Sequence, residues 1–315
     1  MTDFRLPLGS YVESFVDYIT ATFGFVFDFI KYIFDGAYEA VDFVLSAPPF
    51  WAIMIVLALL ALGLRGWKFA VGTIAGLVVI LGVDQWANAM DTLALVLVAS
   101  VIAIAISLPL GILAAKFDIA SNIIRPILDF MQTMPAFVYL IPALILFRVG
   151  VVPGIVATII FAMAPGVRLT ELGIRSVDKE VVEAGQAFGA SPMRILRQIQ
   201  LPLATPTIMA GVNQVIMLSL SMVVIAGMVG AGGLGQQVVT SLNRIDIKLG
   251  FEAGLAVVIL AIFLDRITAS LGDTHSTGMF GTIRLVLRAK TKPDISAAEV
   301  PGSASTAAPA EPARV

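Results

Sequence analysis

Long apolar runs alternate with short polar segments along the chain. Seven of these runs approach the length of about 20 residues with which a helix crosses the hydrocarbon core of a bilayer. They lie at about residues 48–64, 68–83, 91–115, 123–147, 153–171, 206–229 and 250–271. Because a helix satisfies its backbone hydrogen bonds within itself, we expect helices rather than barrel strands. The pattern predicts an all-α, polytopic membrane protein with about seven transmembrane helices.

Residues 1–46 have a different pattern, in which aromatic and aliphatic side chains at helical spacing are interrupted by acidic ones. Phe15 and Tyr18, for example, flank Asp17. This pattern predicts an amphipathic helix that lies at the outer membrane interface. Packing of the same segment on the first span, as a scaffold, is compatible with it.

The other segments complete the domain organisation. Residues 47–88 hold two accessory transmembrane helices, and residues 89–272 hold the main membrane domain with a polar loop at 172–205. Residues 290–315 are rich in Ala, Pro, Ser and Glu, so they lack the apolar side chains of a core. We expect them to form a disordered cytoplasmic tail.

Composition supports a membrane location and excludes several functions. The chain is 58% hydrophobic and only 13% charged, whereas soluble domains are about a quarter charged. A net charge of −2 argues against a nucleic-acid partner, and the absence of cysteine with a single histidine argues against a metal site. The N-terminus has no basic stretch leading into an apolar core, so no cleaved signal peptide is expected.

The distribution of Lys and Arg predicts the orientation. With the N-terminus outside and the C-terminus inside, 15 of the 20 basic residues fall in inner segments. The positive-inside rule therefore favours a multi-pass protein with an outer N-terminus and a cytoplasmic C-terminus.

The polar loop at 172–205 contains sequence signals for the end of one helix and the start of another. Gly189 can end a first helix, and Ser191 and Pro192 suit the N-cap and first residue of a second. Two short helices with apolar and basic surfaces could fill a groove on a partner protein. The chain has no G-x-x-x-x-G-K-[ST] sequence, so an ATPase would have to be a separate subunit.

The same loop resembles the EAA signature of the permeases of binding-protein-dependent importers. The matching positions, at the spacing of that signature, are Glu183, Ala184, Gly185, Gly189, Ile199, Leu201 and Pro202. Gly185 stands where the family commonly has a third alanine. The resemblance implies a type I ABC importer (MetI-like) transmembrane domain whose loop, including Ser191 and Pro192, docks in a cleft of the ATPase.

A longer stretch resembles the permeases for glycine betaine, proline betaine and related quaternary amines. It includes DFMQTMPAFVYLIPALILF, PTIMAGVNQVIMLSLSMVVIA and VVILAIFLDRITAS, between about Asp129 and Ser270. This resemblance implies a bacterial inner-membrane complex of two permease copies, two cytoplasmic ATPases and an external binding protein, embedded in membrane lipid. ATP and Mg would bind the ATPase, with no cofactor on this chain. Choline, carnitine or an amino acid is an alternative cargo, and an ion-coupled secondary transporter is an alternative mechanism.

Helix breakers and uncharged polar residues mark a possible translocation path. Pro126, Pro135, Pro142 and the pair Pro165-Gly166 predict bent spans. The candidate path residues are Gln132, Thr133, Pro135, Asn213, Gln214, Ser219 and Ser221. Hydrogen bonds between spans are the other interpretation of these polar side chains.

Two further clusters have two interpretations each. Gly230, Gly232, Gly233 and Gly235 could form an outer gate or a re-entrant turn. Charged residues near the inner span ends, namely Arg125 with Asp129, Glu171, and Asp265 with Arg266, could serve transport, but interfacial ion pairs are favoured. Arg125 and Asp129 are four residues apart, so we expect them to pair.

Overall fold

The computed structural model describes residues 7–272, and within them every regular element is a helix. The helices are α1 Leu8–Ser46, α2 Phe50–Arg65, α3 Trp67–Gly82, α4 Trp86–Lys116, α5 Asp118–Thr133, α6 Ala136–Phe147, α7 Val151–Arg175, α8 Lys179–Ala187, α9 Pro192–Ile195, the π-helical turn η1 Leu196–Gln200, α10 Leu201–Ser221, α11 Val223–Gly227, α12 Gly233–Arg244 and α13 Ile247–Gly272. The predicted all-α fold is confirmed. The tail predicted at 290–315 lies outside the described residues.

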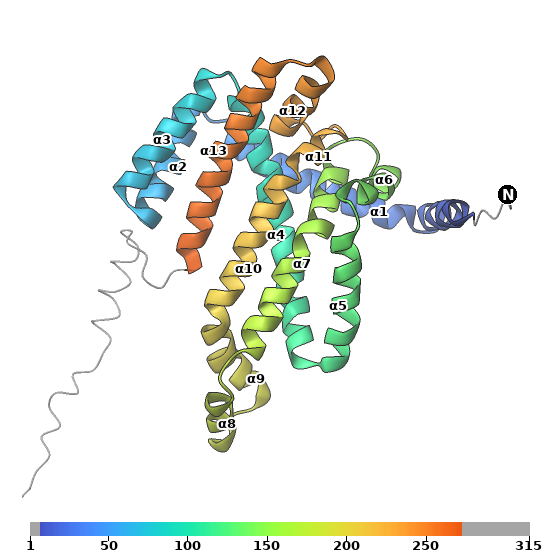
Figure 1. Ribbon diagram of the computed structural model, residues 1–315, viewed down its shortest axis with the longest axis vertical. Coiled ribbons are helices and arrows are strands. Elements are labelled where there is room, and N and C mark those ends of the chain that lie inside the picture. The colour runs from blue at the N-terminus through green and yellow to red at the C-terminus, as the bar shows by residue number, and fades with distance from the viewer. Residues whose placement is uncertain (1–6, 273–315) are drawn as a thin grey trace, which may run out of the picture.

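The centre of the bundle is formed by α4, α7 and α10, which run side by side (Figure 1). Small residues allow this close approach, as in other membrane helix pairs. A Cβ on Gly111 of α4 would lie 2.5 Å from Cβ of Thr170 on α7, and one on Gly166 of α7 would lie 2.5 Å from Oγ of Ser107. Larger side chains at these positions would push the helices apart.

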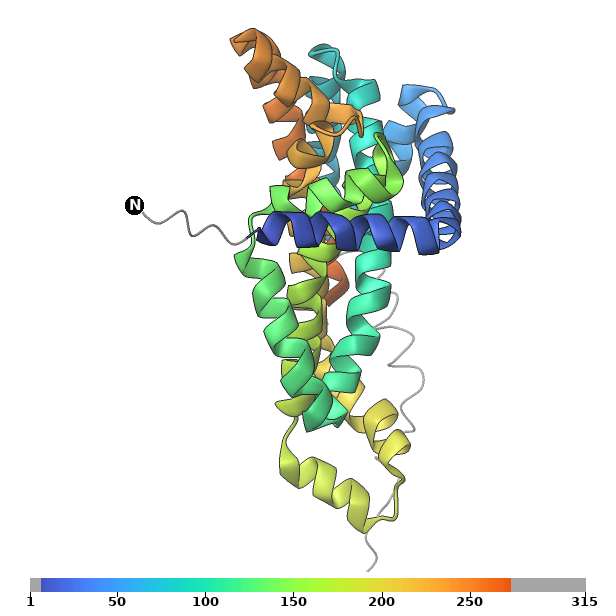
Figure 2. The same ribbon diagram turned by 90° about the vertical axis from the view of Figure 1, so that its right-hand side faces the viewer.

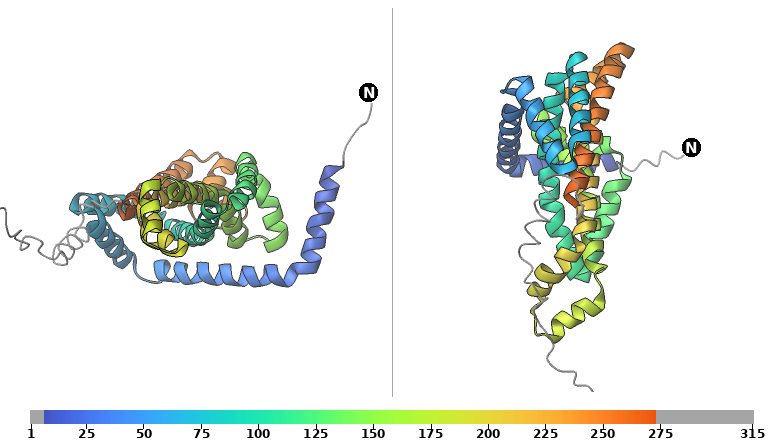
Figure 3. Two further views of the ribbon diagram at one scale, coloured as in Figure 1. Left: turned by 90° about the horizontal axis from the view of Figure 1, so that it is seen from below. Right: turned by 90° about the vertical axis from the view of Figure 1, so that its left-hand side faces the viewer.

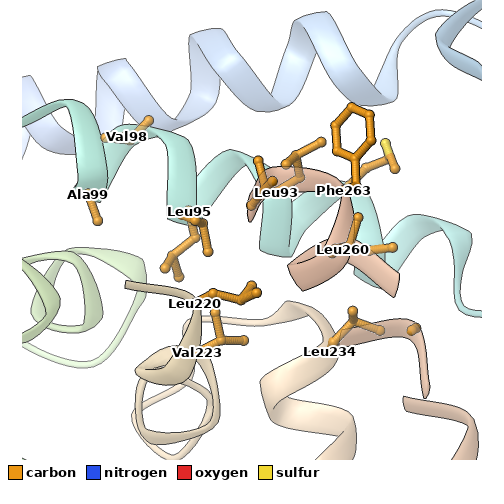
Figure 4. Packing of buried hydrophobic residues seen from close by; sticks show 14 of the residues in the cluster. Leu93, Leu95, Val98, Ala99, Leu220, Val223, Leu234, Leu260 and Phe263 are labelled. Carbon is orange, nitrogen blue, oxygen red and sulfur yellow. The ribbon is translucent and has the colours of Figure 1, made fainter. Parts of the chain in front are cut away.

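The largest apolar cluster joins this centre to the later helices. Leu93 of α4, Leu220 of α10, Leu234 of α12 and Leu260 of α13 meet in it (Figure 4). Three of these leucines have 2% or less of their surface exposed, so α12 and α13 are fixed to the centre by packing.

Among the described residues, four helical segments are long and apolar enough to span a bilayer. They are Trp86–Lys116, Val151–Arg175, Pro192–Gly227 and Ile247–Ser270. Counting each of two bent pairs as one span gives up to six, with the shorter apolar helix Trp67–Gly82 in addition, and the exact number of about seven stays a prediction. The pair of α1 with α2 is bent by 99°, and α3, at 16 residues or about 24 Å, is short for a span.

The run predicted as one span at 123–147 is broken by a bend of 98° between α5 and α6. Met134 has extended backbone (φ −73°, ψ 136°), because the ring of Pro135 disfavours helical geometry in the preceding residue. Pro126, Pro142 and Pro165 lie inside helices that continue through them. Only one of the predicted breakers therefore ends a helix.

The predicted N-terminal helix is present as α1, which lies across the long helices and turns at Phe23 (Figures 2 and 3). Its second half packs on the bundle, where Lys31 Nζ donates a hydrogen bond to the carbonyl of Phe147 at 3.2 Å. Phe27 contacts the Phe147 ring edge-on, with centroids 5.7 Å apart. This packing agrees with the scaffold interpretation, whereas the location of α1 at the outer interface stays a prediction.

Candidate functional site: the projecting loop between α7 and α10

The loop between α7 and α10 projects from one end of the molecule (Figures 1 and 2). Its first helix, α8, has every residue at least partly exposed. Glu183 and Ala184 are exposed, and Phe188, just beyond the helix, has 92% of its surface exposed. An aromatic side chain so open to solvent marks a surface suited to a protein partner.

Both ends of α8 are fixed by local hydrogen bonds. At the start, the Asp178 carboxylate accepts from the backbone N–H of Glu180 at 2.9 Å. At the end, Gly189 has a φ of +75°, and the N–H groups of Gly189 and Ala190 donate to the carbonyls of Gln186 and Gly185. This is a Schellman cap, and it confirms Gly189 as the predicted helix terminator. Asp178 was missed, although Asp is a favoured N-cap residue.

The second predicted helix is not a separate element. Pro192 is the first residue of α9, as expected, but within the described chain the Ser191 side chain makes no capping hydrogen bond. The helix then continues through η1 into α10. The N–H of Leu201 bonds to the carbonyl of Leu196, five residues back, immediately before Pro202, which lacks an N–H. The π-helical turn thus joins the loop to the membrane span.

The two halves of the EAA-like sequence pack against each other. A Cβ on Gly185 would lie 2.7 Å from Cδ1 of Ile199, so the small residue lets α8 approach η1. Leu196 of η1 packs with Ile174 at the end of α7 and with Ala204 in α10. Each of these three residues has at most 4% of its surface exposed. The loop is therefore in packing contact with both flanking helices.

A cavity of about 260 Å³ separates α8 from the ends of α4 and α7. Its lining residues are Ala115, Ile174, Arg175, Val177, Lys179, Val182, Glu183, Gln186 and Gln200. The cavity leaves α8 attached mainly through its two ends and through η1. Contacts of α8 with the rest of the chain are therefore concentrated on α9 and η1.

An ion-pair network fixes α5 to the end of α7. The Glu171 carboxylate, only 4% exposed, accepts from Ser121 Oγ at 2.7 Å and pairs with Arg125 at 2.8 Å and Arg175 at 3.1 Å. Arg175 also donates to Asp118 and to the carbonyl of Ala114, both at 2.8 Å. A buried carboxylate needs such partners because burying an unpaired charge is costly.

The network overturns one sequence prediction. Arg125 pairs with Glu171 and not with Asp129, which instead pairs with Arg168. The helices α5 and α7 lie side by side, so partners across the interface replace the neighbour four residues along α5. The general expectation that these charged residues form ion pairs is confirmed for Glu171, and its location at an inner span end stays a prediction.

The comparisons with known proteins agree with this geometry. Residues 107–273, just over half of the chain, match the family model of the binding-protein-dependent transport system inner membrane component. The chain belongs to this family. It is an inner-membrane, multi-pass permease component of ABC transporters, which work with an ATPase and a binding protein.

Two curated permeases are similar over most of the chain. The glycine betaine/carnitine transport permease protein GbuB of Listeria monocytogenes is 48% identical over 84% of this chain and 94% of its own. The glycine betaine/proline betaine transport system permease protein ProW of Escherichia coli is 48% identical over 87% and 77%. A chain of the inward-facing MetNI methionine ABC transporter shares the fold, with a TM-score of 0.53, 22% identity, and coverage of 60% and 94%.

Several of the permease's candidate path residues make internal hydrogen bonds. Asn213 Nδ2 donates to Asp265 at 3.0 Å, and Thr268, which the sequence did not single out, donates to Asn213 Oδ1. Ser219 is buried and donates to the carbonyl of Val215 at 2.9 Å. These bonds agree with the interpretation of polar residues as bonds within and between spans.

The other candidates are more open. Gln214 and Ser221 are exposed and seven residues apart, so they share one face of α10. Thr133 and Pro135 are exposed at the bend between α5 and α6, beside the half-buried Gln132. Their role in a translocation path stays a prediction.

The glycine segment of the permease forms a tightly packed turn. Gly230, Gly232 and Gly233 have φ values of +83°, +78° and +66°. A Cβ on Gly235 would collide with the carbonyl of Val223, and the N–H of Leu234 donates to Thr92 Oγ1 at 2.8 Å. This geometry favours the turn, and a gating role stays a prediction.

Proposed function

We propose that the chain is the membrane-spanning permease subunit of an ATP-driven importer for glycine betaine, proline betaine and related quaternary amines. Two copies would assemble with two cytoplasmic ATPases and an external binding protein, and ATP and Mg would bind the ATPases. Similarity to the betaine permeases over more than four fifths of the chain supports the cargo. The exposure of α8 and Phe188 is the observation that carries the coupling role.

Coupling would begin with a displacement of α8 by the ATPase. The contact of Gly185 with Ile199 passes this displacement to η1 and hence to α10. The three residues between α7 and α8 pass it to α7, whose end is fixed to α5 by Glu171. Movements of α7 and α10 together would open and close a cavity between two copies, as expected for alternating access.

The loop would face the cytoplasm, with the N-terminus outside and the C-terminus inside. Arg65 is the last residue of α2, and its Nε donates a hydrogen bond of 3.1 Å to the carbonyl of Arg266 in the last two turns of α13. The end of α13 points toward the side of the molecule from which α8 projects (Figure 1). Basic residues gathered at one side of the membrane support the cytoplasmic assignment.

The cargo would be captured first by the binding protein. A quaternary ammonium group is recognised by aromatic side chains through cation–π attraction, so selectivity among betaine, carnitine and choline belongs mainly to that subunit. The permease would then need only an uncharged polar passage. Gln214 and Ser221 on the exposed face of α10 are the residues that we propose for it.

The test is uptake of labelled glycine betaine into vesicles that contain the complete transporter. We expect accumulation with internal ATP, none with a non-hydrolysable analogue, and competition by unlabelled proline betaine. Accumulation driven by an ion gradient without ATP would favour a secondary transporter and contradict the proposal. ATP-driven uptake of choline alone would retain the coupling role and replace the cargo.

A further inference from the structure

A cavity of about 210 Å³ lies between α3 and α13, far from α8. Figure 3 shows α2, α3 and α13 together on one flank of the molecule. The cavity is lined by Lys68, Phe69, Gly72, Thr73, Gly76, Leu77, Ile259, Leu260, Ile262 and Phe263. Its wall is apolar apart from one end.

Two glycines of α3 create the hollow. Gly76 lies against Ile259, where a Cβ would come within 2.7 Å of Cγ2, so the helices touch there. Gly72, one turn earlier on the same face, has open space where its Cβ would be. The side chain missing at Gly72 therefore leaves the cavity open between the two helices.

Two stacked aromatic rings line the cavity, and the hydroxyl group in its wall already has a hydrogen-bond partner. Phe69 and Phe263 are stacked with ring centroids 6.4 Å apart and an interplanar angle of 12°. The Thr73 hydroxyl donates to the Phe69 carbonyl at 3.0 Å, so its donor is already used within α3. Such a surface suits a hydrocarbon chain and offers little to a polar solute.

The charged end of the cavity is formed by Lys68, which is exposed and follows the exposed Trp67. Aromatic and basic residues together are typical of the level of the lipid headgroups. Arg266, at the same end, is also exposed. An apolar hollow with a cation at the headgroup end matches a lipid with an anionic headgroup.

We propose that this cavity binds an anionic phospholipid, with an acyl chain between α3 and α13 and its phosphate against the Lys68 ammonium group. The occupant is a lipid because α3 and α13 are apolar helices of a membrane protein and the hollow is open to their surroundings. The headgroup is anionic because the polar end carries positive charge. This inference is independent of the coupling role of α8.

The test uses the full-length chain in phosphatidylcholine vesicles that contain a trace of phosphatidylglycerol with a diazirine in its acyl chain. After illumination, labelled positions are mapped by mass spectrometry. We expect labelling to concentrate on the lining residues of α3 and α13. Lys68→Gln should reduce it about fivefold, since one basic residue near the surface contributes about that factor, and Lys68→Arg should restore it.

A matched pair of variants tests the shape of the site. Gly72→Leu should fill the hollow and remove the labelling, whereas Gly82→Leu, on the same helix and also with open space at its Cβ, should leave it unchanged. Equal thermal unfolding of all variants in detergent would show that they are folded. The loss of labelling in Gly72→Leu supports the proposal only if that variant is folded.

Three results would overturn the proposal. Equal labelling by the phosphatidylcholine analogue would mean an unselective lipid contact. Unchanged labelling in Lys68→Gln would exclude the role of the ammonium group. Loss of labelling on addition of soluble glycerol phosphate would mean that the site binds a free phosphate ester, and not a lipid. Transport activity is not needed for any of these measurements.

Discussion

Replacing Phe188 with alanine removes an aromatic side chain that touches little of its own chain. Its exposed fraction of 92% means that the folded permease gains little from it, so we expect the thermal unfolding of the isolated subunit to change within error. If an ATPase covers the ring, almost all of its apolar surface is removed from water. Burial of a Phe contributes about 1.5–3 kcal/mol.

The variant should therefore bind the ATPase about 2 kcal/mol more weakly, which is about a 30-fold loss of affinity. The assay is binding of purified ATPase to permease immobilised in nanodiscs. Phe251→Ala is the matched control, because Phe251 is also largely exposed, at 70%, but lies near the start of α13, away from the loop. Equal ATPase affinity of Phe188→Ala and wild type would refute the docking role of this side chain.

Other variants test separate parts of the account. Glu171→Gln unpairs two arginines and should cost about 1–3 kcal/mol, lowering the unfolding temperature, whereas Asp129→Asn, at an exposed pair, should cost less than about 1 kcal/mol; equal melting of the two would contradict the buried network. Gly235→Ala places a methyl group against the Val223 carbonyl and should destabilise by about 1–3 kcal/mol or more, seen as a lower melting temperature or yield; wild-type melting would show that the turn is loose. Glu183→Lys should release the ATPase during purification while the permease stays folded; full co-purification with normal transport would exclude this residue from docking.

The sequence predicts the loop best where local chemistry decides the structure. Gly189 is the clearest case, because the cap of α8 needs a positive φ that glycine adopts without strain. Pro192 begins the next helix for an equally local reason. The spacing of Gly185 and Ile199 also has a structural cause, since the two residues touch.

Features that depend on tertiary packing could not be predicted in the same way. Arg125 has an acid four residues along its own helix, but its partner is Glu171, 46 residues away, because α5 and α7 are neighbours. Four prolines predict bends, but the sequence does not indicate that the chain breaks at Pro135 while the helices continue through Pro126, Pro142 and Pro165. The 16-residue α3 has the composition of a span without its length.

The central claim is that an ATPase subunit docks on α8, and the chain's lack of cysteine allows a direct test. In Phe188→Cys the new thiol is the only one in the permease, and its rate of maleimide labelling can be measured with and without bound ATPase. We predict that the ATPase slows labelling at least tenfold, while a thiol introduced by Phe251→Cys reacts at the same rate in both cases. Equal rates at position 188 with and without the ATPase, in a complex shown to be assembled, would contradict the account.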